Sequence, residues 1–322
     1  MDRFDAVALG ELLIDFTQNG LSEQGNLLFE ANPGGAPANV LAMLRKLGKH
    51  CAFIGKVGAD AFGELLARTV SDAGVDLRGL RRDEQVHTTL AVVQTLPGGD
   101  RDFSFYRKPG ADLMLRPEEL DEEALQNCRI FHFGSLSLTD EPCRSATQRA
   151  LALAKDGGAL ISFDPNLRPP LWDSEKQARE QIAWGLARCD IAKIADNELL
   201  FLTGQEDFDA GAAILRERYP NIRLMNVTAG ANGSFSYYGA YRVFEPACKR
   251  GGVIETTGAG DTFCACVLNY VLENGLDGLS EAQLHEMLRF ANHAAYIVTT
   301  KKGAIRSMPE RAAVEALLRE LA

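Results

Sequence analysis

One segment in the last third of the chain combines glycines with a carboxylate, a pattern suited to phosphate chemistry. It reads Thr256-Thr257-Gly258-Ala259-Gly260-Asp261, with the strand-like pair Val253-Ile254 before it and an apolar helical pattern after it. Glycines let a backbone approach a ligand closely, and the free N–H groups of a helix N-terminus attract phosphate. A carboxylate at Asp261 would lie beside that phosphate, where it can accept a proton from an attacking hydroxyl group. Taken alone, the segment also fits an Asp that only caps the helix.

A second glycine segment carries residue types that suit a sugar. It reads Asn32-Pro33-Gly34-Gly35-Ala36-Pro37-Ala38-Asn39 and leads into a helical pattern over 38–47. Pro37 suits the first turn of a helix. The amide of Asn39 would project from that turn, where it can bind the hydroxyl groups of a polyol. The alternative is a tight turn with a structural Asn.

Neither glycine segment matches the other common nucleotide-binding motifs. The chain has no GxxxxGK[ST] sequence, so it has no P-loop. Phe263 stands where the third glycine of a dinucleotide fingerprint would be, and no early strand–GxGxxG–helix unit occurs. An NAD-dependent oxidoreductase therefore remains only a third alternative.

The elements that must position these segments alternate between strands and helices. Short continuous apolar runs predict strands buried on both faces, and hence parallel strands covered by helices: Ala6–Leu9, Cys51–Ile54, Ile130–Phe133, Ala159–Phe163, Ile191–Ile194 and Leu224–Val227. Helical patterns lie between and after them: Ala38–Leu47, Phe62–Asp72, Pro142–Lys155, Ser174–Arg188, Ala210–Arg218, Leu284–Val298 and Pro309–Leu321. This alternation predicts a layered α/β fold.

Two regions interrupt this alternation, at about 15–32 and 88–110. In the second, the turn residues Pro97-Gly98-Gly99-Asp100 lie between two β-rich halves, which predicts a hairpin. We expect the two regions to form one small sheet that acts as a lid over the end of the main sheet. No linker or internal repeat separates them from the rest, so 1–322 is predicted to be a single domain with the lid as an excursion.

The composition excludes several classes of partner. The net charge of −10 over 322 residues argues against nucleic acid. No apolar stretch approaches the length that spans a bilayer, and the acidic N-terminus does not read as a signal peptide. The seven cysteines are scattered without a CxxC pair, which indicates reduced thiols and a cytoplasmic location. Cys264 and Cys266 lie in an apolar helical run, which favours packing over metal binding.

Together the two glycine segments resemble the signatures of the ribokinase-like (PfkB) family of carbohydrate kinases. The first signature is similar to 34–39, continued at Leu47-Gly48 and at 54–63, and the second is similar to 256–261. Asp164-Pro165-Asn166-Leu167-Arg168 and the segment 228–233 also follow in the order of the family. The resemblance extends over essentially the whole chain. It implies a three-layer α/β/α sandwich with a mostly parallel central sheet and a small β lid.

The resemblance also implies a reaction and the residues that perform it. A sugar hydroxyl would be phosphorylated by ATP with Mg²⁺, with Asp261 as the catalytic base. Charge on the phosphoryl group would be held by the backbone N–H groups of Gly258, Ala259 and Gly260. The sugar would be bound by a set of polar and glycine residues near the first strand end and the glycine turn, with one arginine near the sugar or the phosphates: Asp15, Gly34, Gly35, Asn39 and Arg168.

The nucleotide side follows from the same resemblance. The family's Thr-x-Gly-x-x-Gly loop and Lys-x-Asn-x-x-Glu element, and the C-terminal helix that lines its adenine site, map onto Thr228, Gly230, Gly233, Lys193, Glu198 and Asn292. Glu198 would help to hold the Mg²⁺ network through water. Two positions depart from the family pattern. Ala195 replaces the Asn of the second element, and Glu255 replaces an Asp that helps to bind a monovalent cation in some relatives, which leaves potassium open.

Fructose is the expected sugar. The segments 33–39 and 105–115 resemble the fructokinase version of the family motifs, and Arg107 in the second is expected to reach from the lid to the sugar or to phosphate. A kinase for 2-keto-3-deoxygluconate is the nearest alternative, since Arg107 and Arg168 suit a carboxylate. Another sugar kinase of the family and a fructokinase-like binding protein without turnover are further alternatives. Relatives often dimerise through their lids, so a homodimer is also expected.

Overall fold

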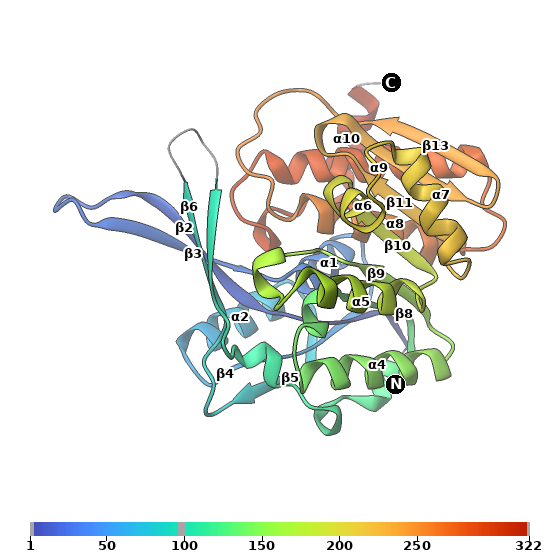
Figure 1. The fold of residues 1–322 in the computed structure, drawn as a ribbon. Helices are drawn as coiled ribbons and strands as arrows, with labels where there is room; N and C mark the ends of the chain where they lie inside the picture. Colours follow the sequence, from blue (N-terminus) through green and yellow to red (C-terminus); the bar gives the residue numbers. More distant parts are fainter. Residues whose placement is uncertain (1–2, 96–100, 321–322) are drawn as a thin grey trace.

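The central sheet of the computed structural model positions the site (Figure 1). The structure describes residues 3–95 and 101–320. Within these ranges nine strands form one sheet in the order β13-β12-β11-β10-β9-β8-β1-β4-β5. Neighbouring strands are parallel, except near one edge, where β12 pairs antiparallel with both β11 and β13. The strands are β1 Phe4–Leu9, β4 Cys51–Gly58, β5 Asp76–Asp83, β8 Cys128–Gly134, β9 Leu160–Asp164, β10 Ile191–Ala195, β11 Leu224–Thr228, β12 Gly233–Tyr238 and β13 Tyr241–Pro246.

Helices cover both faces of this sheet, as the continuous apolar strands predict. In β1, Ala6 and Ala8 pack into one core and Val7 and Leu9 into the other. The first core is covered by α1 Ala36–Lys46, α2 Ala61–Asp72, α8 Ala259–Asn274, α9 Glu281–Thr299 and α10 Arg311–Glu320. The second is covered by α3 Glu122–Gln126, α4 Cys143–Asp156, α5 Glu175–Leu186, α6 Asp196–Thr203 and α7 Phe208–Arg218. The predicted three-layer sandwich is confirmed.

The lid is a separate four-stranded sheet that extends from the layered body (Figure 1). Its order is β3-β2-β6-β7, with β2 Leu13–Leu21, β3 Leu27–Gly34, β6 Leu90–Thr95 and β7 Arg101–Tyr106. Strand β2 pairs with β6 in parallel, and both outer pairings are antiparallel. The two interrupting regions therefore lie in one sheet, although they are distant in sequence. The predicted turn at 97–100 lies outside the described residues.

One predicted strand is wrong. Val253 and Ile254 belong to no strand, and their side chains are 59% and 58% exposed. The backbone N–H of Ile254 donates to the carbonyl of Thr299 at the end of α9, so the segment runs beside that helix instead of joining a sheet. Two adjacent apolar residues are too short a run to bury both faces of a strand.

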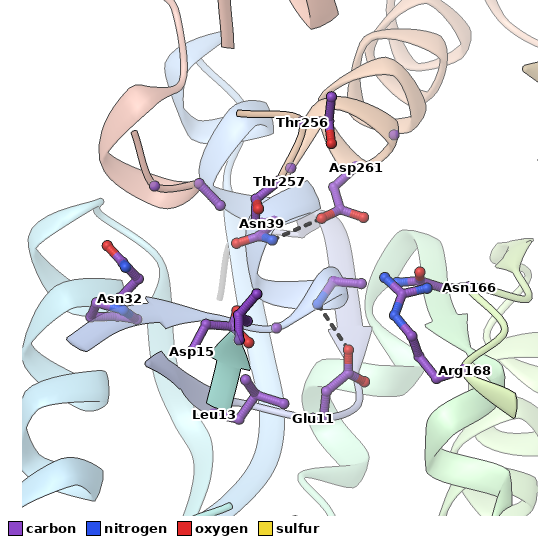
Figure 2. Close-up of a pocket in the computed structure, with 18 of the residues that line it drawn as sticks. Glu11, Leu13, Asp15, Asn32, Asn39, Asn166, Arg168, Thr256, Thr257 and Asp261 are labelled. Carbon is purple, nitrogen blue, oxygen red and sulfur yellow. Dashed lines mark hydrogen bonds between the residues drawn. The ribbon is translucent and has the colours of Figure 1, made fainter. Parts of the chain in front are cut away.

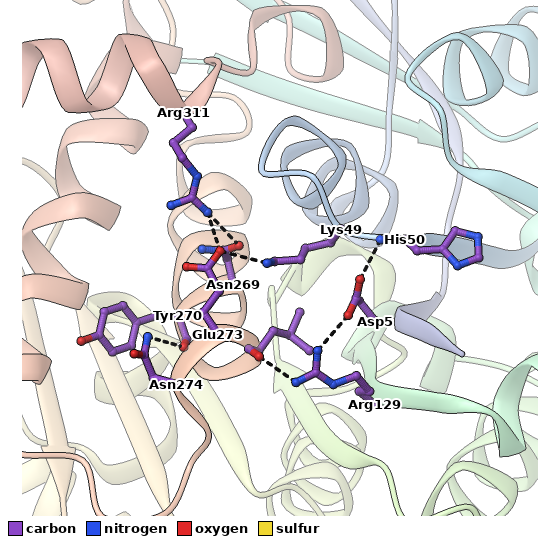
Figure 3. Close-up of polar contacts among 10 residues, drawn as sticks. Asp5, Lys49, His50, Arg129, Asn269, Tyr270, Glu273, Asn274 and Arg311 are labelled. Atoms are coloured by element: carbon purple, nitrogen blue, oxygen red, sulfur yellow. Dashed lines mark hydrogen bonds and ion pairs between the residues drawn. The ribbon is translucent and has the colours of Figure 1, made fainter. Parts of the chain in front are cut away.

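Helix α8 is held at its C-terminal end by a group of charged residues (Figure 3). Lys49 and Arg311 both pair with Glu273, at 2.9 Å and 2.6 Å. Arg129 donates to the carbonyl of Leu272 over 2.7 Å. Cations at this end complement the helix dipole. These contacts fix the end of α8 that lies opposite Gly258 and Asp261. Among the described helices, none combines the length and apolar character needed to cross a membrane.

Candidate active site

A cavity of about 290 Å³ lies beyond the carboxyl ends of the central strands (Figure 2). Strands β1 and β8 are neighbours at the point where the strand order reverses, and such a switch point is where open α/β sheets bind ligands. The lid covers one side and the start of α8 the other. Residues from both glycine segments line the cavity together with side chains from the strand ends: Glu11, Asp15, Gly35, Asn39, Asn166, Arg168, Lys193, Glu255, Thr257, Gly258, Gly260 and Asp261.

Asp261 lies in the first turn of α8 and points into this cavity (Figure 2). Asn39, from the first turn of α1, donates its Nδ2 hydrogen to Oδ2 of Asp261 over 2.7 Å. Burial raises the pKa of Asp261, whereas the Asn39 hydrogen bond and the positive charges of Lys193 and Arg168 lower it. The two glycine segments, 222 residues apart, therefore meet at one carboxylate.

The glycine turn before Asp261 presents backbone N–H groups to the cavity. Gly258 has φ +79°, a left-handed conformation that favours glycine. The N–H of Ala259 already donates to the carbonyl of Thr256 over 3.2 Å. Within the described chain, no acceptor bonds the N–H groups of Gly260 and Asp261. Asp261 thus adds a free N–H group at this helix start, and the assignment of Gly258, Ala259 and Gly260 as the phosphate donors stays a prediction.

The sugar-side residues also lie together. Asp15, on β2, faces Gly34, where an added Cβ would lie 3.2 Å from Oδ2 of Asp15. Gly35 has φ +137°, and a Cβ there would lie 2.3 Å from the carbonyl oxygen of Glu11. Burial raises the pKa of Asp15 to about 7, although Arg168 opposes this shift. Oδ1 of Asn39 is buried and has no partner among the described residues, which leaves an acceptor free for a ligand.

Lys193 forms a buried ion pair behind the glycine turn. Its ammonium group lies 3.1 Å from Oδ2 of Asp164. Burial disfavours the charged ammonium, but Asp164, Glu198 and Asp261 outweigh this effect and raise the pKa of Lys193. A Cβ on Gly260 would lie 3.3 Å from its Nζ, so Lys193 sits against the turn.

Glu198 lies deeper than the cavity lining. It is 3% exposed and accepts hydrogen bonds from the backbone N–H groups of Leu167 and Ala195, both over 2.8 Å. These bonds join the ends of β9 and β10. Its oxygens keep further lone pairs that a water molecule can use.

The predicted nucleotide loop is formed but lies apart from the cavity lining. Thr228 ends β11, and Gly230 and Gly233 have φ of +52° and +127°. Asn292, on α9, is buried: it accepts from Ser234 and donates to the carbonyl groups of Glu245 and Pro246. Its amide therefore holds β12 and β13 together, and its place in the adenine site stays a prediction.

Arg107 does not reach the sugar cavity. It is 4% exposed and lies 2.7 Å from Asp112, with further hydrogen bonds to Thr139 and to the carbonyl of Leu136. The partner Asp112 comes only five residues later, and it takes the charge that was expected to serve the ligand. In this structure Arg107 holds the base of the lid, and its contact with the sugar or phosphate stays a prediction.

Glu11 is a cavity residue that the sequence reasoning missed. It follows β1 and lines the cavity, yet it is only 4% exposed. Its position inside the run Leu9-Gly10-Glu11-Leu12 was the available signal, because a lone carboxylate in a buried strand end needs a partner.

The comparisons with known proteins agree with this geometry. A profile described as pfkB family carbohydrate kinase matches residues 3–311. The chain belongs to this family. The predicted family and kinase class are thereby confirmed, and the expectation of an oxidoreductase is set aside.

Relatives of known name are similar over nearly the whole length of this pfkB family chain. Probable fructokinase-2 of Arabidopsis thaliana is 43% identical over 94% of this chain and 92% of its own. The ATP-bound fructokinase of Xylella fastidiosa is 30% identical, with a TM-score of 0.89 over 98% of this chain and 99% of that one. A double mutant of the Vibrio cholerae O395 fructokinase, bound to fructose, ADP and potassium, is 31% identical, with a TM-score of 0.87 over 99% of both chains.

Proposed function

We propose that this kinase transfers the γ-phosphate of ATP to the 6-hydroxyl group of D-fructose. The observation that carries the proposal is the position of Asp261, a half-buried carboxylate at the start of α8 that faces a cavity of sugar size. Relatives named fructokinase, one of them bound to fructose and ADP, support the choice of substrate.

The chain's own residues account for the chemistry. Asp261 accepts the proton of the hydroxyl group as its oxygen attacks phosphorus, and Asn39 orients the carboxylate and favours its ionised form. The unpaired N–H groups of Gly260 and Asp261, with the positive end of α8, stabilise the charge that spreads over the phosphoryl oxygens. Lys193 lies against the same turn and adds positive charge there.

The carboxylates near the glycine turn fit a Mg²⁺ ion that is bound together with ATP. No cluster of three or more ligand side chains occurs within 3–95 and 101–320. Mg²⁺ in such enzymes is held mainly by phosphate and water, with one or two carboxylates. Asp164 and Glu198 carry more negative charge than Lys193 neutralises, and Glu198 can accept from a water of that ion. When bound, Mg²⁺ neutralises the phosphates.

The remaining nucleotide contacts come from backbone rather than from Asn292. The loop of Thr228, Gly230 and Gly233 ends β11 at the same edge of the sheet as Lys193 at the end of β10. In this proposal the loop lies along the nucleotide, and Asn292 keeps β12 and β13 in place beneath it.

The charges of the cavity favour a neutral sugar over 2-keto-3-deoxygluconate. Glu11, Asp15 and Asp261 are carboxylates that line it, and Lys193 is already paired with Asp164. Arg107, which would have suited a carboxylate, is held by Asp112 outside the lining. A carboxylate substrate would depend on Arg168 alone among the described lining arginines. Neutral hydroxyl groups can instead donate to the carboxylates.

An ADP-release assay with ATP and Mg²⁺ tests the proposal against fructose, ribose, glucose, 2-keto-3-deoxygluconate, adenosine and tagatose. Turnover with fructose at far higher kcat/KM than the others is expected. Turnover with another compound of this panel would change the assigned substrate and leave the mechanism as proposed. Sugar binding without turnover by the intact protein would instead indicate a binding role and overturn the proposal.

Whether potassium activates this kinase is the remaining question about its ions. Glu255 accepts from the hydroxyl of Thr257 over 2.5 Å and from the N–H of Gly303 over 3.1 Å, so its carboxylate already bridges this loop. We expect potassium to be dispensable. Equal kcat in potassium and tetramethylammonium salts would support this, and strong activation by potassium would contradict it.

The lid also supports a proposed homodimer. Its β2–β3 hairpin carries three exposed leucines, Leu21, Leu27 and Leu28. Pairing of two lids would cover these side chains. Light scattering after size exclusion should give twice the monomer mass of 35.1 kDa, and the monomer mass would exclude the dimer.

The free cysteines of the described chain suit the predicted cytoplasmic location.

A further inference from the structure

Glu11 lies in the sugar cavity on the side opposite Asp261 (Figure 2). Its Oε1 accepts the backbone N–H of Ala36, the first residue of α1, over 2.8 Å. Its backbone carbonyl lies against Gly35, where no side chain fits. The side chain is thus held in one orientation, between the end of β1 and the start of α1.

Anchoring the helix does not explain why this residue is an acid. A neutral side chain oxygen can accept a helix N–H equally well, as Ser, Thr and Asn do at helix starts. A buried carboxylate is costly unless a donor compensates it. Burial raises the pKa of Glu11 to about 7, against the effect of two backbone N–H groups and of the nearby Arg107. Asp112 adds to the rise, so a hydrogen bond donated by a ligand would favour the ionised carboxylate.

We propose that Glu11 binds the acceptor sugar and determines specificity, with its carboxylate accepting a hydrogen bond from a hydroxyl group remote from the one that is phosphorylated. The inference rests on the proposed function. If the 6-hydroxyl group of fructofuranose lies at Asp261, the 1-hydroxyl and the anomeric hydroxyl lie at the other side of the ring. Glu11 faces that side, and Asp15 lies beside it (Figure 2).

The structure distinguishes this role from those of the neighbours. Asn39 bonds Asp261 directly and therefore belongs to the reacting end. Asp15 is on the lid strand β2, so its position follows the lid. Glu11 is attached to the rigid body through β1 and α1. The position of its carboxylate therefore does not depend on the lid.

Steady-state kinetics of wild type and E11Q tests the inference with three sugars. These are fructose, 2,5-anhydro-D-mannitol, which lacks the anomeric hydroxyl, and 1-deoxy-D-fructose, which lacks the 1-hydroxyl. Gln keeps an oxygen for Ala36 and an equal volume, so the fold should survive. With fructose we expect E11Q to raise KM at least about 10-fold and to change kcat much less, because a charge-assisted hydrogen bond is lost.

The analogues decide the outcome. For the one that lacks the hydroxyl bound by Glu11, wild type and E11Q should show the same KM. An equal rise in KM with all three sugars, or a fall in kcat alone, would overturn the inference and leave the proposed function intact. Failure of the wild type to phosphorylate fructose would overturn both.

Two controls separate binding from stability. E64Q changes an exposed glutamate of α2 that pairs with Arg82 of β5, and it should match wild type. E11D keeps the charge and retracts it by one methylene, so it should also raise KM for fructose. A melting temperature of E11Q equal to that of wild type would show that the helix anchor is kept, and unchanged KM in such a stable variant would refute the inference.

Discussion

Asn39 and Asp261 are joined by a 2.7 Å hydrogen bond that links the starts of α1 and α8 across the candidate active site. The bond lowers the pKa of Asp261, which burial raises. Removal of the donor should therefore raise this pKa further, so that Asp261 is protonated at higher pH. For N39A we expect the acid limb of the kcat/KM profile to move to higher pH, in addition to weaker sugar binding. An unchanged acid limb in a folded variant would show that Asp261 is not the group that titrates.

The role of Asp261 itself is tested by D261N. Amide and carboxylate have the same size, so the variant should fold and bind ATP and fructose. Without a proton acceptor, kcat should fall at least ~100-fold. Quench-flow of ATP with fructose measures this, and equilibrium dialysis of fructose serves as the control. Near-normal kcat would remove Asp261 from the role of base.

Asp15 should make the protein less stable as pH rises. Its folded-state pKa of about 7 exceeds the ordinary value of 3.8, so the folded state holds the proton more tightly. This contribution to stability is present below about pH 4 and is lost as pH rises through 7. D15N lacks it. Relative to wild type, D15N should gain about 2 kcal/mol in unfolding free energy between pH 5 and pH 8. Urea titrations at both pH values measure the difference, and parallel curves would contradict it.

Gly35 should tolerate a side chain much less than Gly48 does. Both have positive φ, but an added Cβ meets the carbonyl of Glu11 only at Gly35, while nothing lies within 4 Å at Gly48. G48A should cost about 1–2 kcal/mol from the left-handed backbone alone. G35A should cost more and should also raise KM for fructose, because Glu11 moves. Denaturant unfolding of both variants compares the costs, and equal costs would argue against the close approach.

The buried pair of Arg107 and Asp112 should matter for stability rather than for direct sugar contact. R107M leaves Asp112 unpaired in the interior and should cost about 3–5 kcal/mol. The double variant R107M/D112N has no buried charge and should recover most of that loss. Calorimetric unfolding of the three proteins gives the comparison. A double variant as unstable as R107M would indicate that Arg107 acts mainly through Leu136 and Thr139.

The framework could be read from the sequence because its strands are continuous apolar runs. Ile130–Phe133 and Ile191–Ile194 have no polar face, so only a covered parallel sheet accommodates them. The pair Val253-Ile254 has the same composition but lies in an exposed loop. Residue type alone does not distinguish a strand from an apolar loop that is this short.

The site could be read only where its motifs are local. The segments ending at Asn39 and Asp261 show which residues act, because each is a turn leading into a helix. The contacts of Arg107 and Asn292 could not be predicted, because the sequence does not show that Asp112 and the β12–β13 pair lie beside them. Glu11 was missed because its importance depends on the distant N–H of Ala36.

The packing of α8 against α1 has a consequence for synthesis on the ribosome. Helix α1 and strand β1 emerge early, but the helix that covers them spans Ala259–Asn274. Until that segment leaves the exit tunnel, Leu41 and Leu44 of α1 lack their neighbours, and the nascent chain exposes an apolar surface. Stalled chains that end before 259 should therefore bind chaperones that recognise apolar surface, and release should follow once α8 is available.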